Sequence, residues 1–238
     1  MSIRSFVKGI YDQQIEELTG CREFKAIELG AATRQEYDAF IGNVITNHLS
    51  SPQYLAFLYS VAPPAARERL EHNMLEELGL EEETGDSHPD LLRKLADGAG
   101  LTSQLAKFEQ QAEERLREVA STRLLYGTLK EAGLSTMCEI NAFEYMLSRV
   151  SGSMATALEK HRKLDSDALK WFTHHSVVDV QHAEEGFQSI DDFVAYYEFS
   201  DEDAKTIAEM SLRENTYIKR YFGDISQGRA AGMLRDDP

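Results

Sequence analysis

The segment HSVVDVQH, residues 175–182, lies within a longer stretch whose apolar residues recur at helical spacing. At about 100° per residue, His175, Asp179 and His182 fall within a sector about 60° wide, so two imidazoles and one carboxylate project from one side of the helix. Apolar residues on the flanking sectors let this helix pack while the polar groups face a common cavity. The segment therefore predicts a packed helix with a metal-binding face. The alternative is a pair of ordinary helix histidines with a solvated aspartate between them.

Helical patterns cover almost the whole chain. Thr33-x-x-Glu36 and Ser200-x-x-Asp203 have the spacing of helix N-terminal caps, and Gly79 is a natural helix stop. No run alternates with a period of two, so we expect no β-sheet. The chain is therefore predicted to be an all-α bundle. The expected helices lie at about 2–18, 33–48, 51–62, 65–79, 87–95, 101–151 (interrupted at Gly127 or Gly133), 167–190 and 200–223.

Length and charge limit the domain organisation and the partners. The chain has 238 residues, enough for a full core in one domain, and no stretch resembles a linker. We expect a single domain over residues 1–223 and a polar, Gly-rich tail over 224–238. The 25 basic and 41 acidic side chains give a formal charge of -16, which repels phosphate backbones and anionic membrane surfaces. Nucleic acid and membranes are therefore not expected as partners.

The cysteines and the N-terminus predict the compartment. Cys21 and Cys138 cannot form a disulfide framework, which fits a reducing cytosol. The first residues mix apolar and charged side chains at helical spacing, without the apolar run of a signal peptide. No stretch approaches the roughly 20 apolar residues that span a bilayer. We expect a cytoplasmic protein in which Cys138 is a small core residue rather than a nucleophile.

Further candidate ligands lie on other predicted helices. Glu144 is an acid among apolar residues in AFEY, where an unpaired buried charge would cost several kcal/mol and a metal ion would offset that cost. Alternatively, Glu144 lies at the surface or pairs with Arg149. Glu77 lies in NMLEELG and His88 follows after a connector, although acids in such a run are commonly a solvated face. A metal cluster in a helical bundle needs carboxylates and imidazoles from facing helices, which these stretches would supply.

Together, NMLEELG with the following HPDLL, AFE, and HSVVDVQHAEE resemble the heme-oxygenase-like diiron oxidase and oxygenase family, which includes CADD-like proteins and is related to TenA and PqqC. The resemblance runs from Thr33 to about Glu185. It implies a heme-oxygenase-like helical bundle of about seven or more helices around a central cavity. By resemblance, the iron ligands are Glu77, His88, Glu144, His175, Asp179 and His182. The interval from Glu77 to His88 is longer than in the CADD-like pattern, which leaves Glu81 as a rival ligand.

A helix break distinguishes Glu77 from Glu81. If residues 77–88 formed one continuous helix, Glu77 and His88 would lie about 16 Å apart along its axis, and Glu81 would be favoured at about 10 Å. Gly79 and the turn-like sequence TGDS that follows it instead indicate a break that folds His88 back toward Glu77. We therefore predict that Glu77 is the ligand paired with His88.

The resemblance also implies O2 chemistry at two irons. Carboxylate and imidazole ligands without a thiolate suit iron or manganese, and the family selects a diferrous, O2-reactive pair. Proteins of this kind oxidise amino acids, fatty acids and similar small amines or carboxylates by desaturation, N-oxygenation or C-C cleavage. The expected partners are O2 and a small-molecule substrate, and a homodimer is left open. The protein's own task is to hold the irons, exclude water and orient the substrate.

Aromatic and basic residues near these motifs are candidates for substrate contacts, although such residues are more commonly packing or surface. Arg149 is the candidate for binding a substrate carboxylate. The candidates for lining the pocket are His48, Tyr54, Phe57, Trp171 and His174.

Two functions of other classes share the predicted fold. A metal-independent enzyme of cofactor metabolism would resemble TenA or PqqC, and a TenA-like thiaminase would rely on a cysteine and acids in its pocket. A non-catalytic helical interaction protein would keep a vestigial metal site. The full set of candidate ligands favours the metal enzyme over both alternatives.

Overall fold

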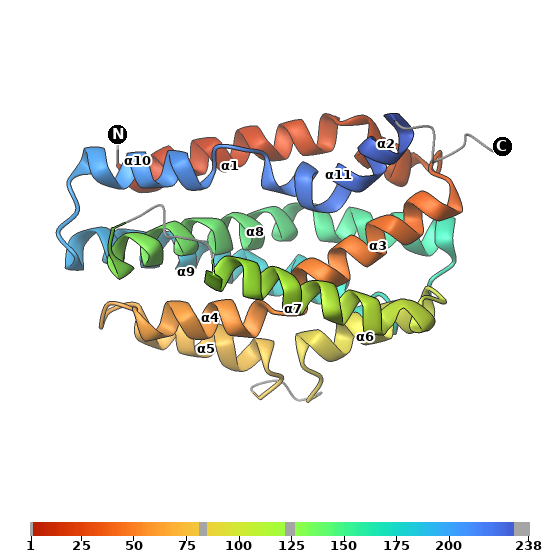
Figure 1. Cartoon of the computed structure of the whole chain (residues 1–238), viewed down its shortest axis with the longest axis horizontal. Helices are drawn as coiled ribbons and strands as arrows, with labels where there is room; N and C mark the ends of the chain where they lie inside the picture. Colours follow the sequence, from red (N-terminus) through yellow and green to blue (C-terminus); the bar gives the residue numbers. More distant parts are fainter. Residues whose placement is uncertain (1, 81–84, 122–126, 231–238) are drawn as a thin grey trace.

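Two long helices lie at the centre of the molecule. The computed structural model describes residues 2–80, 85–121 and 127–230. Within it, α8 (Leu129–Ala157) and α9 (Lys170–Tyr196) lie side by side along the length of the protein (Figure 1). A π-helical turn, η2 (Leu158–Arg162), follows α8 and ends at Lys163, whose φ of 60° is left-handed. This pair forms the framework that the other helices cover.

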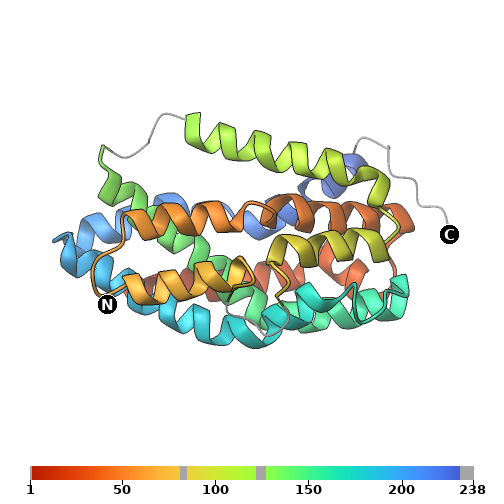
Figure 2. The same cartoon turned by 90° about the horizontal axis from the view of Figure 1, so that it is seen from below.

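The covering helices are α1 (Ile3–Gly20), α2 (Arg22–Leu29), α3 (Arg34–His48), α4 (Ser51–Ser60), α5 (Arg67–Glu77), α6 (His88–Gly98), η1 (Thr102–Gln104), α7 (Leu105–Ser121), α10 (Asp201–Ser211) and α11 (Thr216–Ala230). In Figure 1, α1, α2, α10 and α11 lie above the central pair, and α4, α5 and α6 lie below it. α7 packs on the outside of α3, and the view from below in Figure 2 shows α5 and α6 near α9. The end of α5 and the start of α6 are thereby held against the middle of the bundle.

Helix boundaries confirm most of the sequence signals and correct others, because the single helix expected over 200–223 is two helices, α10 and α11. Thr33 and Glu36 form the expected capping box, and Ser200 caps α10. The interruption expected within 101–151 is found near Gly127, one of its two expected positions, because α7 ends at Ser121 and a capping box at Thr128 begins α8. Gly133 does not break α8. An added Cβ there would lie 2.9 Å from the Phe193 ring, so glycine allows α8 and α9 to pack closely.

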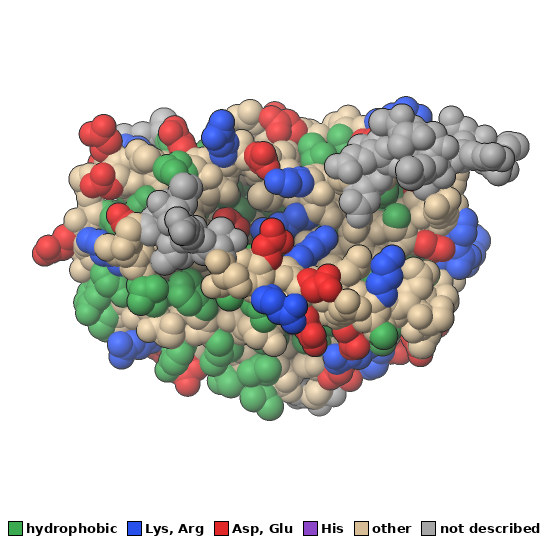
Figure 3. Space-filling model, viewed as in Figure 1, with side chains coloured by type: hydrophobic (Ala, Val, Ile, Leu, Met, Phe, Trp, Pro, Cys, Tyr) green, Lys and Arg blue, Asp and Glu red, His purple; other side chains and the backbone are tan. Residues whose placement is uncertain are grey.

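The described part of the chain contains helices and no β-strand, which confirms the all-α fold. α11 continues past the expected end near Gly223 to Ala230, so residues 224–230 are helical, whereas 231–238 lie outside the described residues. None of the described helices is long and apolar enough to cross a membrane. On the face shown in Figure 3, acidic and basic side chains are interspersed in the middle, and apolar side chains gather at the lower left.

The core combines an apolar cluster with a group of buried polar side chains. Phe40 stacks on Phe172 and Phe222, with ring centroids 6.3 and 5.4 Å away. Besides Glu36 in the capping box of α3, the buried acidic and histidine side chains come from α5, α6, α8 and α9: Glu77, His88, Glu144, His175, Asp179 and His182. Buried ionisable groups are costly unless they are paired or bind a metal. This group is therefore the place to look for a functional site.

Candidate metal centre

The middle of α9 presents one polar face to the core. His175, Asp179 and His182 are all buried, whereas Val177 and Val180 between them are 72% and 63% exposed. This pattern follows from the helical spacing, because residues three and four apart lie on the same face. The two imidazoles and the carboxylate thus point into the bundle, and apolar residues of the same segment point to solvent.

His175 meets Glu77 and His88 in a fully buried group, which we call the inner triad. The Oε1 atom of Glu77 lies 2.9 Å from Nδ1 of His88, and the rings of His88 and His175 have centroids 4.7 Å apart. One ligand atom from each residue lies within 4.8 Å of the other two. Burial acts to raise the pKa of Glu77, but His88 outweighs it and holds this pKa below its usual value. The inner triad therefore offers an ionised carboxylate beside two imidazoles.

The connector between α5 and α6 brings Glu77 and His88 together. α5 ends at Glu77, Gly79 is left-handed with a φ of 68°, and Ser87 caps α6, which begins at His88. An added Cβ at Gly79 would lie 2.7 Å from the backbone of Asp86, so the two ends of the connector lie close together. The chain thus turns back as the sequence predicts. The rival ligand Glu81 lies outside the described residues, and the choice of ligand stays a prediction.

A backbone hydrogen bond fixes the tautomer of His175. Its Nδ1 atom lies 2.6 Å from the carbonyl oxygen of Trp171, which can only accept, so Nδ1 carries the proton. Burial, together with the neighbouring His88, holds the pKa of His175 well below its usual value. A neutral imidazole with a protonated Nδ1 leaves Nε2 free to bind a metal. Metal-bound histidines in proteins are held in the same way.

Glu144 and Asp179 place two more carboxylates beside the inner triad. Glu144 accepts a 2.5 Å hydrogen bond from Nδ2 of Asn73 at Oε1, but its Oε2 and the Oδ2 of Asp179 have no hydrogen-bond partner among the described residues. Burial raises the pKa of Glu144 to about 7 and that of Asp179 to about 6. Both carboxylates interact electrostatically with Glu77 and with His182. They therefore lie close enough to the inner triad and to His182 to interact with both.

His182 belongs to a different group, which we call the outer triad and which contains His72 and Glu76. Nε2 of His182 hydrogen-bonds Oε2 of Glu76, and Nδ1 of His72 lies 3.7 Å from the same oxygen. Burial acts to lower the pKa of His182, but carboxylates around it, with Asp179 and Glu76 contributing most, raise this pKa to about 11. Neither His72 nor Glu76 was predicted from the sequence as a metal ligand. The signal was present in the i, i+4 spacing of His72 and Glu76.

These side chains fit iron. Four carboxylates and four imidazoles with no thiolate form the set Glu76, Glu77, Glu144, Asp179, His72, His88, His175 and His182. Hard and borderline divalent metals prefer such oxygen and nitrogen ligands, and two histidines with one carboxylate form the usual triad of non-heme Fe(II) sites. The unpartnered oxygens of Glu144 and Asp179 would also gain a positive neighbour, which offsets the cost of burying them.

The comparison with known families agrees with this chemistry. A family described as "iron-containing redox enzyme", with a heme-oxygenase-like fold, matches residues 38–214. The chain belongs to this family. A search of curated proteins finds no match to the chain.

The family membership covers the whole candidate centre. Both triads, as well as Glu144 and Asp179, lie within residues 38–214. As a member of this family the protein is an oxidoreductase, and iron is the metal that the family's description names. The resemblance drawn from NMLEELG, AFE and HSVVDVQHAEE is thereby confirmed at the level of the family.

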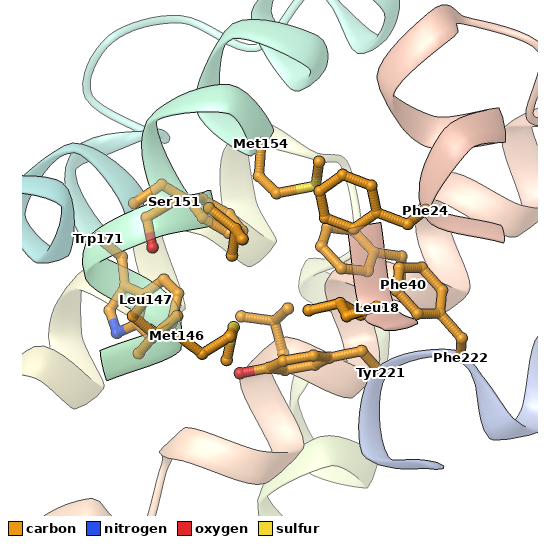
Figure 4. A pocket seen from close by; sticks show the side chains of 13 residues that line it. Leu18, Phe24, Phe40, Met146, Leu147, Ser151, Met154, Trp171, Tyr221 and Phe222 are labelled. Atoms are coloured by element: carbon orange, nitrogen blue, oxygen red, sulfur yellow. The ribbon is translucent and has the colours of Figure 1, made fainter. Parts of the chain in front are cut away.

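An apolar cavity of about 20 Å³ lies beside the candidate iron centre of this enzyme (Figure 4). Trp171 lines it, and its ring centroid is 4.2 Å from that of His175. The hydroxyl of Ser151 and the indole nitrogen of Trp171 lie on the same side of the cavity in Figure 4, and neither has a hydrogen-bond partner among the described residues. The accessible lining of the cavity is nevertheless apolar.

The proposed substrate contacts differ in their positions relative to this family's iron centre. His48 is half-buried, lies 4.9 Å from Trp171 between ring centroids, and bonds to the hydroxyl of Tyr221 at 2.6 Å. The ring of His174 lies 4.9 Å from that of His88. Arg149 instead lies over the Tyr145 ring and lines a surface groove with Gln181 and Glu184. Phe57 and Tyr54 on α4 are half-buried and do not line the cavity of Figure 4.

Cys138 is a core residue in this enzyme. It is fully buried, and burial raises the pKa of its thiol to about 12. A nucleophilic cysteine needs a lowered pKa and access to its substrate. Cys138 has neither feature, which argues against the thiol-dependent alternative.

Proposed function

We propose that this iron-containing redox enzyme is a non-heme diiron oxidase or oxygenase. It would activate O2 to oxidise a small substrate that carries an amine or a carboxylate. Desaturation, N-oxygenation and C-C cleavage are the reactions that the family resemblance suggests. The expected partners are O2 and the substrate, and a homodimer stays a prediction.

One observation carries the proposal. Two groups of two histidines and one carboxylate are present, and Glu144 and Asp179 interact electrostatically with Glu77 of one group and His182 of the other. One metal ion needs at most one such group, so two groups with two further carboxylates would suit two ions. The buried, unpartnered oxygens of Glu144 and Asp179 support this assignment, because without positive neighbours they are costly.

The residues of the chain would hold, orient and shield the centre. The carbonyl of Trp171 keeps Nδ1 of His175 protonated, so that Nε2 would be the atom that binds a metal. Asn73 donates to one oxygen of Glu144 and leaves the other free. The burial of Glu77, His88, His175 and Asp179 would limit the access of bulk water to the centre. Two ferrous ions bound there would supply the electrons that O2 reduction needs.

Iron reconstitution tests the proposal. Purified protein is loaded anaerobically with Fe(II), freed of excess metal and analysed for iron, and its O2 consumption is then measured with candidate amines and carboxylates. We expect about two irons per chain, as the two triads imply. Stopped-flow absorption in the visible after mixing with O2 gives a second readout that does not require the substrate.

Two matched glutamates on α8 sharpen the test. Glu144→Gln removes a carboxylate of the centre and should lower the iron content and abolish the visible transient. Glu139→Gln makes the same change five residues earlier on the same helix, where Glu139 pairs with Arg220 at 3.4 Å, and should leave both unchanged. A plateau at one iron per chain together with no reaction with O2 would overturn the diiron proposal.

A further inference from the structure

Arg220 on α11 places a positive charge beside the part of α8 that leads into the candidate metal centre. Its Cζ atom lies over the Phe143 ring, 5.0 Å from the centroid, and its Nη2 atom lies 3.4 Å from Oε2 of Glu139. Glu139 and Phe143 are four residues apart and therefore share one face of α8. The Arg220 side chain is 39% exposed, whereas Phe143 is buried and is followed directly by Glu144. The guanidinium thus lies on the solvent side of the residue next to Glu144.

Two asparagines of α3 fix the backbone of α11 at this point. Nδ2 of Asn47 donates a 3.1 Å hydrogen bond to the carbonyl oxygen of Arg220, and Nδ2 of Asn43 donates one of the same length to that of Tyr221. The Tyr221 hydroxyl also hydrogen-bonds Nε2 of His48 at 2.6 Å. The backbone of Arg220 is therefore held in place before a ligand binds, which lowers the entropy cost of binding.

Side chains of α3 and α4 complete a site around Phe143. The His48 ring, at the end of α3, stands at 86° to the Phe143 ring, with centroids 5.6 Å apart. His48 and Tyr54 of α4 both interact electrostatically with Arg220. His48, Tyr54 and Arg220 are half-buried, whereas Phe143 is buried. We call these four residues the α11 site.

The α11 site adjoins the inner triad through Ser51. Oγ of Ser51 lies 2.9 Å from the carbonyl oxygen of His48 and 2.5 Å from Oε2 of Glu77. His48 also interacts electrostatically with Glu77 and His88. A ligand at the α11 site would therefore lie near the carboxylate of the inner triad.

Arg220 has hydrogen-bond donors to offer such a ligand. A guanidinium carries five N–H donors in a planar fork that matches the two oxygens of a carboxylate. The 3.4 Å contact with Glu139 is longer than the roughly 2.7–2.9 Å of a charge-assisted hydrogen bond. Burial also raises the pKa of Glu139, which disfavours the negative charge that would neutralise Arg220. A carboxylate from solution can therefore form shorter, paired hydrogen bonds to Arg220.

Arg149, the arginine that the sequence suggested for a substrate carboxylate, lies on another side of α8. Its guanidinium lies 3.3 Å from the centroid of the Tyr145 ring. Phe143 and Tyr145 are two residues apart, so they point about 200° apart around the helix. Arg220 is thus on the side of α8 where Phe143 meets His48, and Arg149 is not.

We propose that Arg220 binds the carboxylate of the substrate, with Phe143 and His48 against the remaining atoms. The inference rests on the proposed function for the presence of an oxidisable substrate, and it narrows the class from amines or carboxylates to carboxylates. α11 (Thr216–Ala230) lies beyond the residues 38–214 that the family matches. Arg220 is therefore a specificity residue of this chain that the family match does not supply.

Binding of butyrate to the full chain tests the assignment. Ligand-observed NMR titrations with butyrate and with butylamine are run on the metal-free protein, where no metal ion can bind the carboxylate. We expect butyrate to bind and butylamine not to bind. Arg220→Gln should raise the dissociation constant for butyrate by about tenfold or more. Arg220→Lys should raise it less, because lysine keeps the charge but lacks the planar fork.

A neighbouring lysine provides the matched control. Lys219→Gln removes the same charge at an exposed position of α11, where Lys219 pairs with Glu214 at 2.5 Å, and should bind butyrate as the wild type does. Arg149→Gln should do the same, and circular dichroism should show unchanged helix content in every variant. The inference is wrong if the wild type does not bind butyrate, if Arg220→Gln binds it equally well, or if Lys219→Gln or Arg149→Gln loses it to the same extent.

Iron loading separates this inference from the proposed function. Arg220→Gln should keep the wild-type iron content, because it removes no metal ligand, and should raise KM for a carboxylate substrate. If the iron-loaded wild type does not react with O2 but binds butyrate through Arg220, the diiron proposal fails and the carboxylate site stands. If it reacts with O2 while Arg220→Gln binds butyrate as the wild type does, the carboxylate site is wrong and the diiron proposal survives.

Discussion

The inner and outer triads contain the same kinds of ligands in different surroundings. Each has two histidines and one glutamate, and the two glutamates, Glu77 and Glu76, are neighbours at the end of α5. Because successive residues of a helix point about 100° apart, one glutamate reaches His88 on α6 and the other reaches His182 on α9. Ser51 on α4 also donates a hydrogen bond to Glu77. The inner triad is therefore enclosed by packing, whereas the outer triad ends at the exposed His72.

This contrast indicates how one helix end can serve two metal positions. A buried triad with a fixed tautomer at His175 is preorganised, so little order has to be gained when a metal binds. In the outer triad, the exposed His72 side chain has to become ordered when a metal binds, and water competes with it for the metal. The two positions are thus expected to differ in affinity even though their donor atoms are the same.

The largest effect is expected from His182, which contacts both sides of the centre. Its Nε2 faces Glu76, and its Nδ1 faces Asp179. His182→Ala should lose at least one iron and lower O2 consumption by about 100-fold, which iron analysis and an oxygen electrode would measure. Helix content should persist in circular dichroism, because alanine favours helix. Turnover equal to that of the wild type would show that the H-x3-D-x2-H face is structural.

The identity of the inner glutamate gives the next largest effect. Glu77 lies 2.9 Å from His88 in a buried position, so Glu77→Ala should weaken the tight metal site by about 10- to 100-fold. Glu81→Ala should leave it unchanged. Calorimetric titration of both variants with Fe(II) under anaerobic conditions decides between them. Loss of binding in the Glu81 variant alone would show that Glu77 is not the ligand.

A stability measurement tests whether the buried carboxylates of the centre serve to bind a metal or contribute to the stability of the fold. Metal at 100 times its dissociation constant should stabilise the protein by about 2.7 kcal/mol, and this should raise Tm by about 5–10 °C, reversibly with a chelator. Glu144→Gln removes a buried charge with an unpartnered oxygen. This variant should be at least as stable as the wild type without metal, and its metal-induced rise in Tm should be smaller. Calorimetric or fluorescence melts measure both quantities.

In that experiment, a metal-free Glu144→Gln variant that melts well below the wild type would contradict the interpretation. Such a result would mean that the carboxylate, paired with Asn73, contributes to the fold itself. Glu139→Gln is again the control, because it alters a half-buried glutamate of the same helix away from the triads.

The smallest effect is expected at Cys138. Cys138→Ser should leave O2 consumption close to that of the wild type, because the thiol is buried and unreactive. The new hydroxyl should reduce stability by about 1–3 kcal/mol unless it finds a hydrogen bond. Steady-state kinetics and a thermal melt measure these effects. If the folded variant lost its activity, the result would favour the thiol-dependent alternative.

Residues close together in the sequence were predictable because helix geometry is local. The spacing within HSVVDVQH placed His175, Asp179 and His182 on one face, and the structure has all three buried. The cap at Thr33 was likewise visible as a capping box. The break between α7 and α8 was expected at Gly127 or at Gly133, and the sequence analysis did not decide between them because the capping box at Thr128 was overlooked.

The sequence by itself determined the all-α class, most helix ends, the family and the polar face of α9, because these depend on periodicity, capping and short motifs. Only the tertiary structure decided which groups meet. The return of the chain after Gly79 places His88 beside Glu77, and the packing of α5 near α9 places Glu76 and His72 beside His182. Distances between helices depend on connectors and on the packing of side chains far apart in the sequence, which periodicity along one helix does not contain.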